Sequence, residues 1–405
     1  MTEPTEPAPE VDQTDAAAVH VPDSESTGDG QIEVEDESEN DDEGLVDIGE
    51  SSLNYFGADF DMAGLVRRLQ DGDIVVPRFD PDETAGATLD GFQRQRVWTA
   101  SRMERFIESL LLGWPVPSIF LVLEPDQRYL VLDGQQRLTA LESYFTGKFP
   151  DGREFRLRDV AEHLKGATYA TLNNESRRRL NNTFIQATVI EPVGPDGPES
   201  VYRLFGRLNS GGVSLTAQEI RVALYRGPIV EWIRDLNHDD NWRRLFGPLH
   251  RRLKDHELIL RSLGLREVLT GIDGKWGDEA LEREAYKPPM SDFLNSFLSR
   301  NRQLESLDSG KLGTAFKSAT LQLVQAVGVD ALRFNGVINA AHVDALMSVL
   351  MNRHEMDNAP SDQALRAALV AVRDSAAYSR YVTRSTSHRD SVIGRLREMS
   401  LAMDS

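Results

Sequence analysis

The sequence predicts an α+β protein in three parts. Residues 1–50 hold 18 Asp or Glu and no Lys or Arg, which predicts a disordered acidic tail. Over residues 52–228, short apolar runs typical of strands alternate with segments of helical spacing, so a mixed α/β domain is expected there. Over residues 229–405 the apolar spacing is helical almost throughout, and we expect a mostly α-helical domain.

The acidic tail accounts for nearly all of the net charge of −20 on the 405-residue chain. Its acidic, Pro, Ser and Thr residues leave little apolar surface to bury, so self-repulsion should keep it unfolded. A solubilising role is the simpler interpretation. The alternative is a segment that mimics nucleic acid and competes for a basic groove on the protein's own body.

Composition excludes several kinds of site. The chain has no Cys, which rules out disulfides, thiolate catalysis and Cys-ligated zinc or iron–sulfur centres. It has no run of 18 apolar residues and no N-terminal signal-peptide pattern, so we expect a cytoplasmic protein without a membrane partner. No Walker A sequence is present, which excludes P-loop chemistry for any nucleotide.

The mixed domain is expected to open with a helix within residues 60–73 and a short strand at 74–79. The next helix should begin near Ser101, which has capping-box spacing to Glu104, and stop at Gly113. Its apolar face would consist of Met103, Phe106, Ile107, Leu110 and Leu111.

Two apolar runs at residues 118–123 and 128–132 flank a turn-rich link and predict a β-hairpin. The second run ends in Asp133 and Gly134 and leads directly into a helix over Gln135–Thr146. The inner face of this helix would be Leu138, Leu141 and Phe145, with Gly147 beyond its end.

A further strand is expected at residues 183–192, followed by a helix that Gly211 and Gly212 end. Thr216 and Glu219 then have capping-box spacing at the start of the next helix. No internal repeat of about 20 to 50 residues is evident beyond this point.

The residues from Asp133 to Arg137 have the chemistry expected of an anion site. A helix that starts directly after a strand exposes backbone N–H groups, and Gly134 lets that backbone approach a phosphate closely. Arg137, in the first turn, could add a bidentate contact. Gln135 and Gln136 can donate and accept together, which suits a ribose, a base edge or a positioned water. A capped helix start with a surface arginine would give the same pattern.

Four blocks follow one another in the chain: QRQRVW, ESLLLGWPVPSIFL, DGQQRLTAL and RLNSGGVSLTAQEIRVAL. Together they resemble the N-terminal domain family of the GmrSD restriction endonucleases, a group with a ParB/sulfiredoxin-like fold. KDHELILRSLGL, YKPPMSDFLNSFL and TSHRDSVIGRLREM resemble the helical half of stand-alone members, so the resemblance spans about residues 50–405. The eight His residues are scattered and lack the His-Asn-His nuclease pattern of two-part members.

The resemblance implies nucleotide handling at the Asp-Gly-Gln-Gln-Arg motif, with hydrolysis of a nucleoside triphosphate in some members. It nominates for nucleotide binding Gln93, Arg94, Asp133, Gly134, Gln135, Gln136, Arg137 and Asn209. The catalytic candidates among them are Asp133, Gln136 and Arg137.

The roles that follow are hypotheses for each side chain. Arg137 and Arg94 would hold phosphate oxygens, and Asp133 would bind Mg²⁺ or orient water. Gln136 would position the attacking water. Trp98 is expected to anchor the core rather than stack on a base.

The leading hypothesis is a component of a restriction or phage-defence system that binds and hydrolyses a nucleoside triphosphate with Mg²⁺. Its helical domain would contact DNA or a partner, and a separate nuclease would cut. The first alternative is a module that binds DNA or nucleotide without turnover. A weaker alternative is that the chain is itself a nuclease. No pattern specifies the nucleotide or the oligomeric state.

Overall fold

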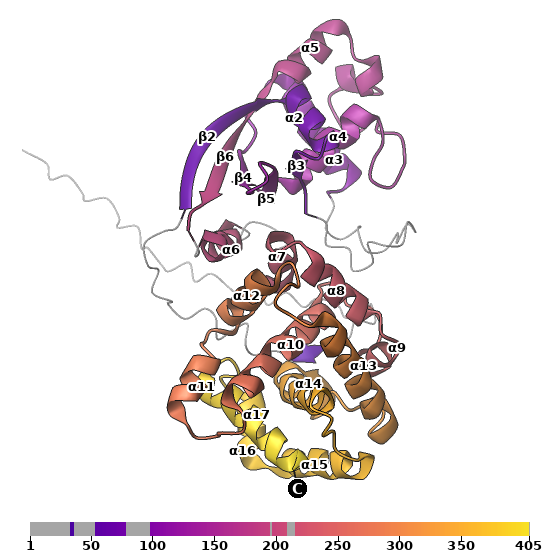
Figure 1. Ribbon diagram of the computed structural model, residues 1–405. Helices are drawn as coiled ribbons and strands as arrows, with labels where there is room; N and C mark the ends of the chain where they lie inside the picture. The colour runs from indigo at the N-terminus through magenta and orange to yellow at the C-terminus, as the bar shows by residue number, and fades with distance from the viewer. Residues whose placement is uncertain (1–32, 36–52, 78–97, 195–196, 209–214, 405) are drawn as a thin grey trace, which may run out of the picture. The chain divides into compact units, whose positions relative to one another are not determined.

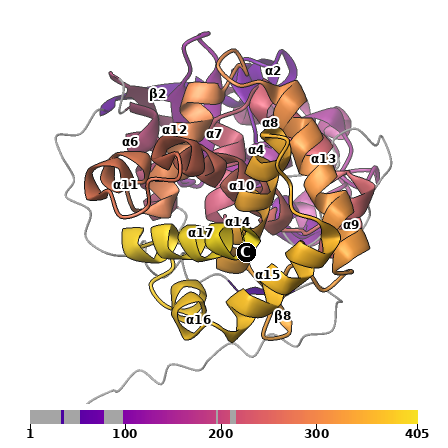
Figure 2. The same cartoon turned by 60° about the horizontal axis from the view of Figure 1, so that its bottom comes forward.

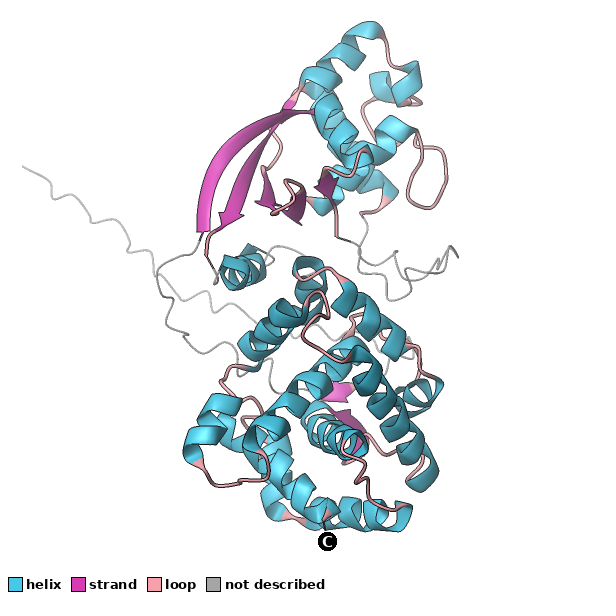
Figure 3. Cartoon of the chain, viewed as in Figure 1, coloured by secondary structure: helices cyan, strands magenta, loops and turns pink. Residues whose placement is uncertain are grey.

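The computed structural model describes residues 33–35, 53–77, 98–194, 197–208 and 215–404 (Figure 1). The chain divides into residues 1–31 and residues 32–405, and every described residue belongs to the second unit. Helices dominate, and the strands form one five-stranded and one three-stranded sheet among the described residues (Figure 3). The predicted α+β class is therefore confirmed.

The larger sheet is mixed, with the strand order β2-β6-β4-β5-β3. Its strands are β2 (Leu53–Asp61), β3 (Ile74–Val75), β4 (Ile119–Leu123), β5 (Tyr129–Asp133) and β6 (Phe184–Pro192). β4 and β5 pair antiparallel as the predicted hairpin, whereas β4 with β6 and β5 with β3 pair in parallel. The hairpin thus places β5 between β4 and β3, inside the sheet.

Helices pack on both faces of this sheet, and β5 contributes to both cores. Leu130 and Leu132 join a cluster with α6 (Gly197–Leu208) and α7 (Ala217–Leu224). Val131 joins the opposite cluster, which includes residues of α2 (Met62–Gln70), α3 (Ala100–Leu112) and α4 (Gln135–Thr146). Because alternate strand residues point to opposite faces, Asp133 shares the face of Val131, where α4 packs.

Two further short helical turns and one helix complete the α4 side of the domain. They are the 3₁₀ helices Glu162–Leu164 and Tyr169–Thr171 and helix α5 (Asn174–Asn182). The predicted bounds of α4 agree with the structure, and Gly147 ends that helix with a φ of 79°. Phe145 of the predicted inner face is only partly buried and stacks on Tyr169 with ring centroids 4.3 Å apart.

The predicted cap of helix α3 is wrong. Thr99 is the N-cap, and its side chain accepts from Arg102 N over 3.3 Å. Ser101 instead bonds Asp159, and Glu104 accepts from the backbone N–H of Asp159 over 2.7 Å. Both residues of the predicted box are therefore used by a loop that is distant in sequence. The predicted stop at Gly113 is confirmed by its left-handed φ of 75°.

The C-terminal part is helical, as predicted, apart from one short hairpin of β7 (Arg333–Phe334) and β8 (Val337–Asn339). Its helices are α8 (Pro228–Asn237), α9 (Asp240–Phe246), α10 (Lys254–Ile272), α11 (Glu279–Ala285), α12 (Met290–Asn301), α13 (Ser309–Ala326), α14 (Ala340–Glu355), α15 (Asp362–Asp374), α16 (Ala376–Thr383) and α17 (Arg389–Met403). α14 packs against α10, α13 and α17 (Figure 2). None of the described helices combines the length and the apolar character needed to cross a membrane.

Strand β1 (Val34–Glu35) lies within the predicted acidic tail and pairs in parallel with β8. Asn339 Nδ2 donates to Glu35 Oε2 over 3.1 Å, and Val34 packs against the helical core. The prediction of disorder does not hold for these residues. An open strand edge and one apolar side chain give this segment a defined position.

A buried charge cluster joins three helices of the C-terminal part. Asp344 on α14 lies 2.8 Å from an Arg261 guanidinium nitrogen and 2.7 Å from one of Arg395, and all three side chains are fully buried. Two guanidinium groups around one carboxylate fix the relative positions of α10, α14 and α17. Removing the carboxylate would leave buried charge without compensation.

We expect Asp344→Asn to lower the free energy of unfolding by roughly 3–5 kcal/mol, because both buried arginines lose their counter-ion. Urea denaturation of the full chain measures this. Asp330→Asn is the control, since Asp330 pairs with Arg333 at the surface with 78% of its side chain exposed, and such pairs contribute little. Equal losses in the two variants would contradict the assigned role of Asp344.

Candidate functional site

The junction between β5 and α4 gathers the residues from Asp133 to Arg137 at one helix start. Gly134 precedes the helix with a φ of 98° and a ψ of 8°, a left-handed conformation that favours glycine. Because Gly134 has no side chain, no side-chain cap satisfies the first backbone N–H groups of α4. Such a helix start favours an anion through its N–H groups and its dipole.

Gly134 also packs closely against the sheet. A Cβ atom at this position would lie 2.4 Å from Cγ2 of Ile119, a fully buried residue at the start of β4. The same atom would lie 3.3 Å from Nη2 of Arg137. The change from strand to helix therefore depends on glycine both for its backbone conformation and for its contact with β4.

Asp133 and Arg137 form an ion pair across the junction. Arg137 Nη2 donates to Asp133 Oδ2 over 2.6 Å, and 11% of the arginine side chain is exposed against 49% of the aspartate side chain. The predicted phosphate ligand is thus buried beside a carboxylate rather than displayed at the surface. Only one of its five N–H groups is used in this bond, and no other described residue accepts from it.

Gln136 connects this junction to the end of the QRQRVW block. Its Oε1 accepts from the backbone N–H of Trp98 over 2.8 Å. The Trp98 ring packs edge-on against Phe106 with centroids 5.6 Å apart, and Arg102 lies over the ring at 4.8 Å. The expectation that Trp98 anchors the core is therefore confirmed. Two motif blocks that are separate in sequence meet at this hydrogen bond.

Gln135 has a buried side-chain nitrogen, Nε2, that bonds to no described residue. A buried donor without a partner costs about 1–3 kcal/mol, so an acceptor at this position would stabilise the protein. The remaining predicted nucleotide-binding residues are Gln93, Arg94 and Asn209, and they lie outside the described residues. The predicted helix stop at Gly211 and Gly212 lies outside them as well.

Asp133 is the residue expected to hold Mg²⁺. Within the described ranges, no group of three His, Cys, Asp or Glu side chains could hold a metal ion. Asp133 Oδ2 is used by Arg137, whereas Oδ1 bonds to no described residue. One carboxylate fits Mg²⁺ when phosphate oxygens and water supply the other ligands.

Glu219 in the fourth block has a structural role. It is fully buried and forms the predicted capping box with Thr216, since its side chain accepts from Thr216 N over 2.8 Å. Arg252 Nη2 also lies 3.8 Å from its carboxylate. On the same helix, buried Arg221 bonds Asn295 Oδ1 over 3.1 Å. Glu219 and Arg221 of α7 therefore have structural partners that account for their burial.

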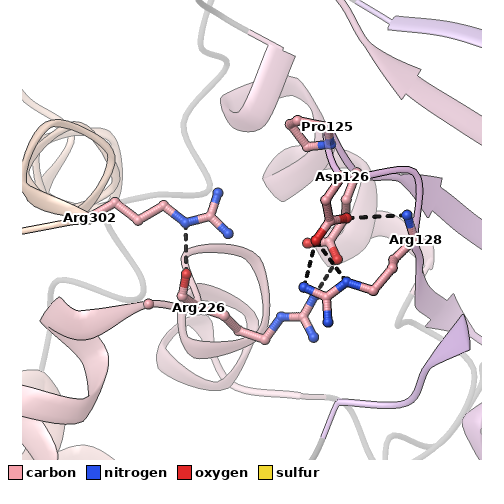
Figure 4. Close-up of a pocket in the computed structure, with 7 residues that line it drawn as sticks. Pro125, Asp126, Arg128, Arg226 and Arg302 are labelled. Carbon is pink, nitrogen blue, oxygen red and sulfur yellow. Dashed lines mark hydrogen bonds and ion pairs between the residues drawn. The ribbon is translucent and has the colours of Figure 1, made fainter. Parts of the chain in front are cut away.

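A second polar cluster, not predicted from the sequence, lines a cavity of about 430 Å³ (Figure 4). Arg226 bonds Glu124, and Arg128 Nη2 lies 2.6 Å from Asp126 Oδ2. The side-chain and backbone hydrogen bonds from Arg128 lower the pKa of Asp126. Arg302, which follows α12, forms the opposite wall. No sequence signal links residues so far apart in the chain.

The fold and the β5–α4 junction define a mixed α/β domain with an uncapped helix start, an Asp–Arg pair and two amide side chains. Residues 80–226 match the model of the family described as GmrSD restriction endonuclease, N-terminal domain. The wider predicted resemblance, over residues 50–79 and 227–405, lies outside the matched segment. No curated protein and no solved structure matches the chain significantly.

We expect Gly134→Ala to destabilise the protein more than Gly147→Ala at the other end of the same helix. Both positions have positive φ, which costs an L-residue about 1–2 kcal/mol. Only at Gly134 does a new Cβ meet another side chain within 4 Å, because the space around Gly147 is open. Overpacking should add about 1–3 kcal/mol at Gly134. Urea denaturation of both variants compares the costs, and equal costs would show that the contact with Ile119 relaxes freely.

Proposed function

We propose that the β5–α4 junction binds a nucleoside triphosphate and, with Mg²⁺, hydrolyses it, as part of a restriction or phage-defence system. The observation that supports this most is the helix start itself. It combines uncapped N–H groups, a glycine that lets the backbone approach a ligand, and a guanidinium held in place by Asp133. The match of this segment to a restriction endonuclease domain agrees with a nucleic-acid setting.

In this proposal the phosphates lie against the N-terminus of α4. The backbone N–H groups and the unused N–H groups of Arg137 would donate to phosphate oxygens. Gln136 already uses its Oε1 to accept from Trp98, so its Nε2 remains to donate to a water or a phosphate oxygen. Gln135 Nε2 is the second amide donor, and it bonds to no described residue.

Asp133 brings negative charge next to a site for anions. A triphosphate would be repelled by this carboxylate unless a cation lay between them. Mg²⁺ would supply that charge and bridge phosphate oxygens, with Asp133 Oδ1 as its protein ligand. Gln93, Arg94 and Asn209 are proposed to complete the site, with Arg94 as a second phosphate ligand.

A second candidate function is nucleotide or DNA binding without turnover, with cleavage by a separate nuclease. The Asp133–Arg137 pair favours it, because Asp133 Oδ2 already accepts from the guanidinium and only Oδ1 is left to contact a metal ion or a water. Binding and phosphate release measured on one preparation separate the two candidates. Binding without release would select the second.

We expect Arg137→Ala to weaken triphosphate binding by about tenfold or more, the loss expected for one charge-assisted hydrogen bond. Calorimetry with each nucleoside triphosphate and Mg²⁺, together with phosphate release, measures the effect. Arg153→Ala is the control, since Arg153 pairs with Asp151 at the surface and its side chain is 66% exposed. Equal binding and equal release in both variants and the unmodified protein would reject the proposed site.

A second variant tests the site without emptying a buried position. In Gln136→Glu a carboxylate oxygen can still accept from Trp98 N, so the local contact with the QRQRVW block is kept. The donor Nε2 is lost, and negative charge is added next to the phosphates. We expect triphosphate binding to weaken while the melting temperature stays close to that of the unmodified protein. Unchanged binding would remove Gln136 from the site.

A further inference from the structure

The arginine cavity near the β4–β5 turn has features of a ligand site that is separate from α4. Arg128 directly precedes β5, and Asp133 is the last residue of that strand. At about 3.3 Å per residue, the two positions lie roughly 17 Å apart along the strand. A ligand in the cavity would therefore contact residues other than those of the helix start.

Two hydrogen bonds with the backbone of residues 226–229 fix the position of Arg302. Its Nε donates to the backbone oxygen of Arg226 over 2.7 Å, and its own backbone oxygen accepts from Ile229 N over 3.3 Å. Gly227, with a φ of 153°, allows the backbone of Arg302 to lie close to the start of α8, because a Cβ at Gly227 would be only 3.0 Å from the Arg302 backbone oxygen. Figure 4 shows the terminal nitrogens of Arg302 turned toward the wall formed by Asp126 and Arg128.

The charges of the lining are not balanced. Glu124 pairs with Arg226 and Asp126 pairs with Arg128, whereas no described acidic residue forms an ion pair with Arg302. Arg226 Nε is buried and bonds to no described residue. The cavity thus offers one arginine, Arg302, whose guanidinium has no acidic partner among the described residues.

We propose that this cavity binds a small phosphorylated ligand, with Arg302 as the main phosphate contact. A guanidinium matches phosphate geometry, and about 430 Å³ is within the usual range for small-molecule sites. Glu124 and Asp126 can accept hydrogen bonds from hydroxyl groups of the same ligand. This mixture of charges favours a sugar phosphate or a nucleoside monophosphate over a polyanion such as the nucleic-acid backbone, which the two carboxylates would repel.

Calorimetry on the full chain with ribose 5-phosphate and with each nucleoside monophosphate tests the proposal. We expect Arg302→Gln to weaken binding by about tenfold or more, as for the loss of one charge-assisted hydrogen bond. Arg300→Gln, in the last turn of the helix that Arg302 follows, is the matched control, because Arg300 pairs with Glu267 and 60% of its side chain is exposed. Unchanged binding in Arg302→Gln, or no binding of any probe by the unmodified protein, would overturn the proposal.

Asp126→Asn supplies a gain-of-function test that misfolding cannot imitate. It removes negative charge from the wall opposite Arg302, and its side chain is half exposed. Inorganic phosphate should then bind severalfold more tightly, and an unchanged or weaker affinity would contradict an anion site in this cavity.

Two further arms separate this site from other sources of binding. The first arm measures binding of a 12-nucleotide single strand. If Arg302→Gln weakens binding of this strand but not of the small probes, Arg302 contacts nucleic acid and the proposal of a small-ligand site is overturned. Binding of the small probes that is lost in Arg137→Ala and kept in Arg302→Gln would assign them to α4 instead. That result would overturn the cavity site and leave the proposed nucleotide site supported, so the two proposals fail separately.

Discussion

The close contact between Gly134 and Ile119 is the constraint on which the rest of the candidate site depends. It lets a buried strand become a helix within one residue, so the start of α4 lies directly against β4. With the helix fixed there, Arg137 is one turn from Asp133 and can pair with it over 2.6 Å. The same placement brings Gln136 to the backbone of Trp98. A larger residue at this position would move all three contacts together.

Much of this geometry could be predicted because its causes are local. The β4–β5 hairpin follows from two apolar runs around a turn, and α4 is bounded at both ends by glycines with positive φ. The Thr216–Glu219 capping box is likewise a relationship within one turn of helix. The mostly helical character of the C-terminal part was also evident from apolar spacing, although α14 is buried along most of its length and has little amphipathic pattern.

The features that escaped prediction depend on tertiary contacts. Ser101 and Glu104 have the spacing of a capping box, yet a distant loop competes for both side chains and Thr99 caps the helix. Asp344 gave no sign in the sequence of its two buried arginine partners on other helices. Strand β1 forms only because β8 offers an open edge far along the chain. The spacing of residues in the sequence predicts which side chains can interact within one helix or strand. It does not predict which groups from distant parts of the chain will bond to the same side chain.

The two proposed arginine sites at opposite ends of β5 differ in charge, and we expect this difference to set the kind of ligand that each would bind. At α4 the guanidinium is paired with Asp133, so only the backbone N–H groups and the helix dipole add positive potential, and a triphosphate there needs a cation. In the cavity, Arg302 is positioned by the backbone oxygen of Arg226 rather than by a carboxylate, and its charge stays available. Under the proposal for the cavity, a ligand with a single phosphate would therefore need no metal ion there. Holding an arginine by a neutral carbonyl keeps its direction without reducing its attraction for an anion.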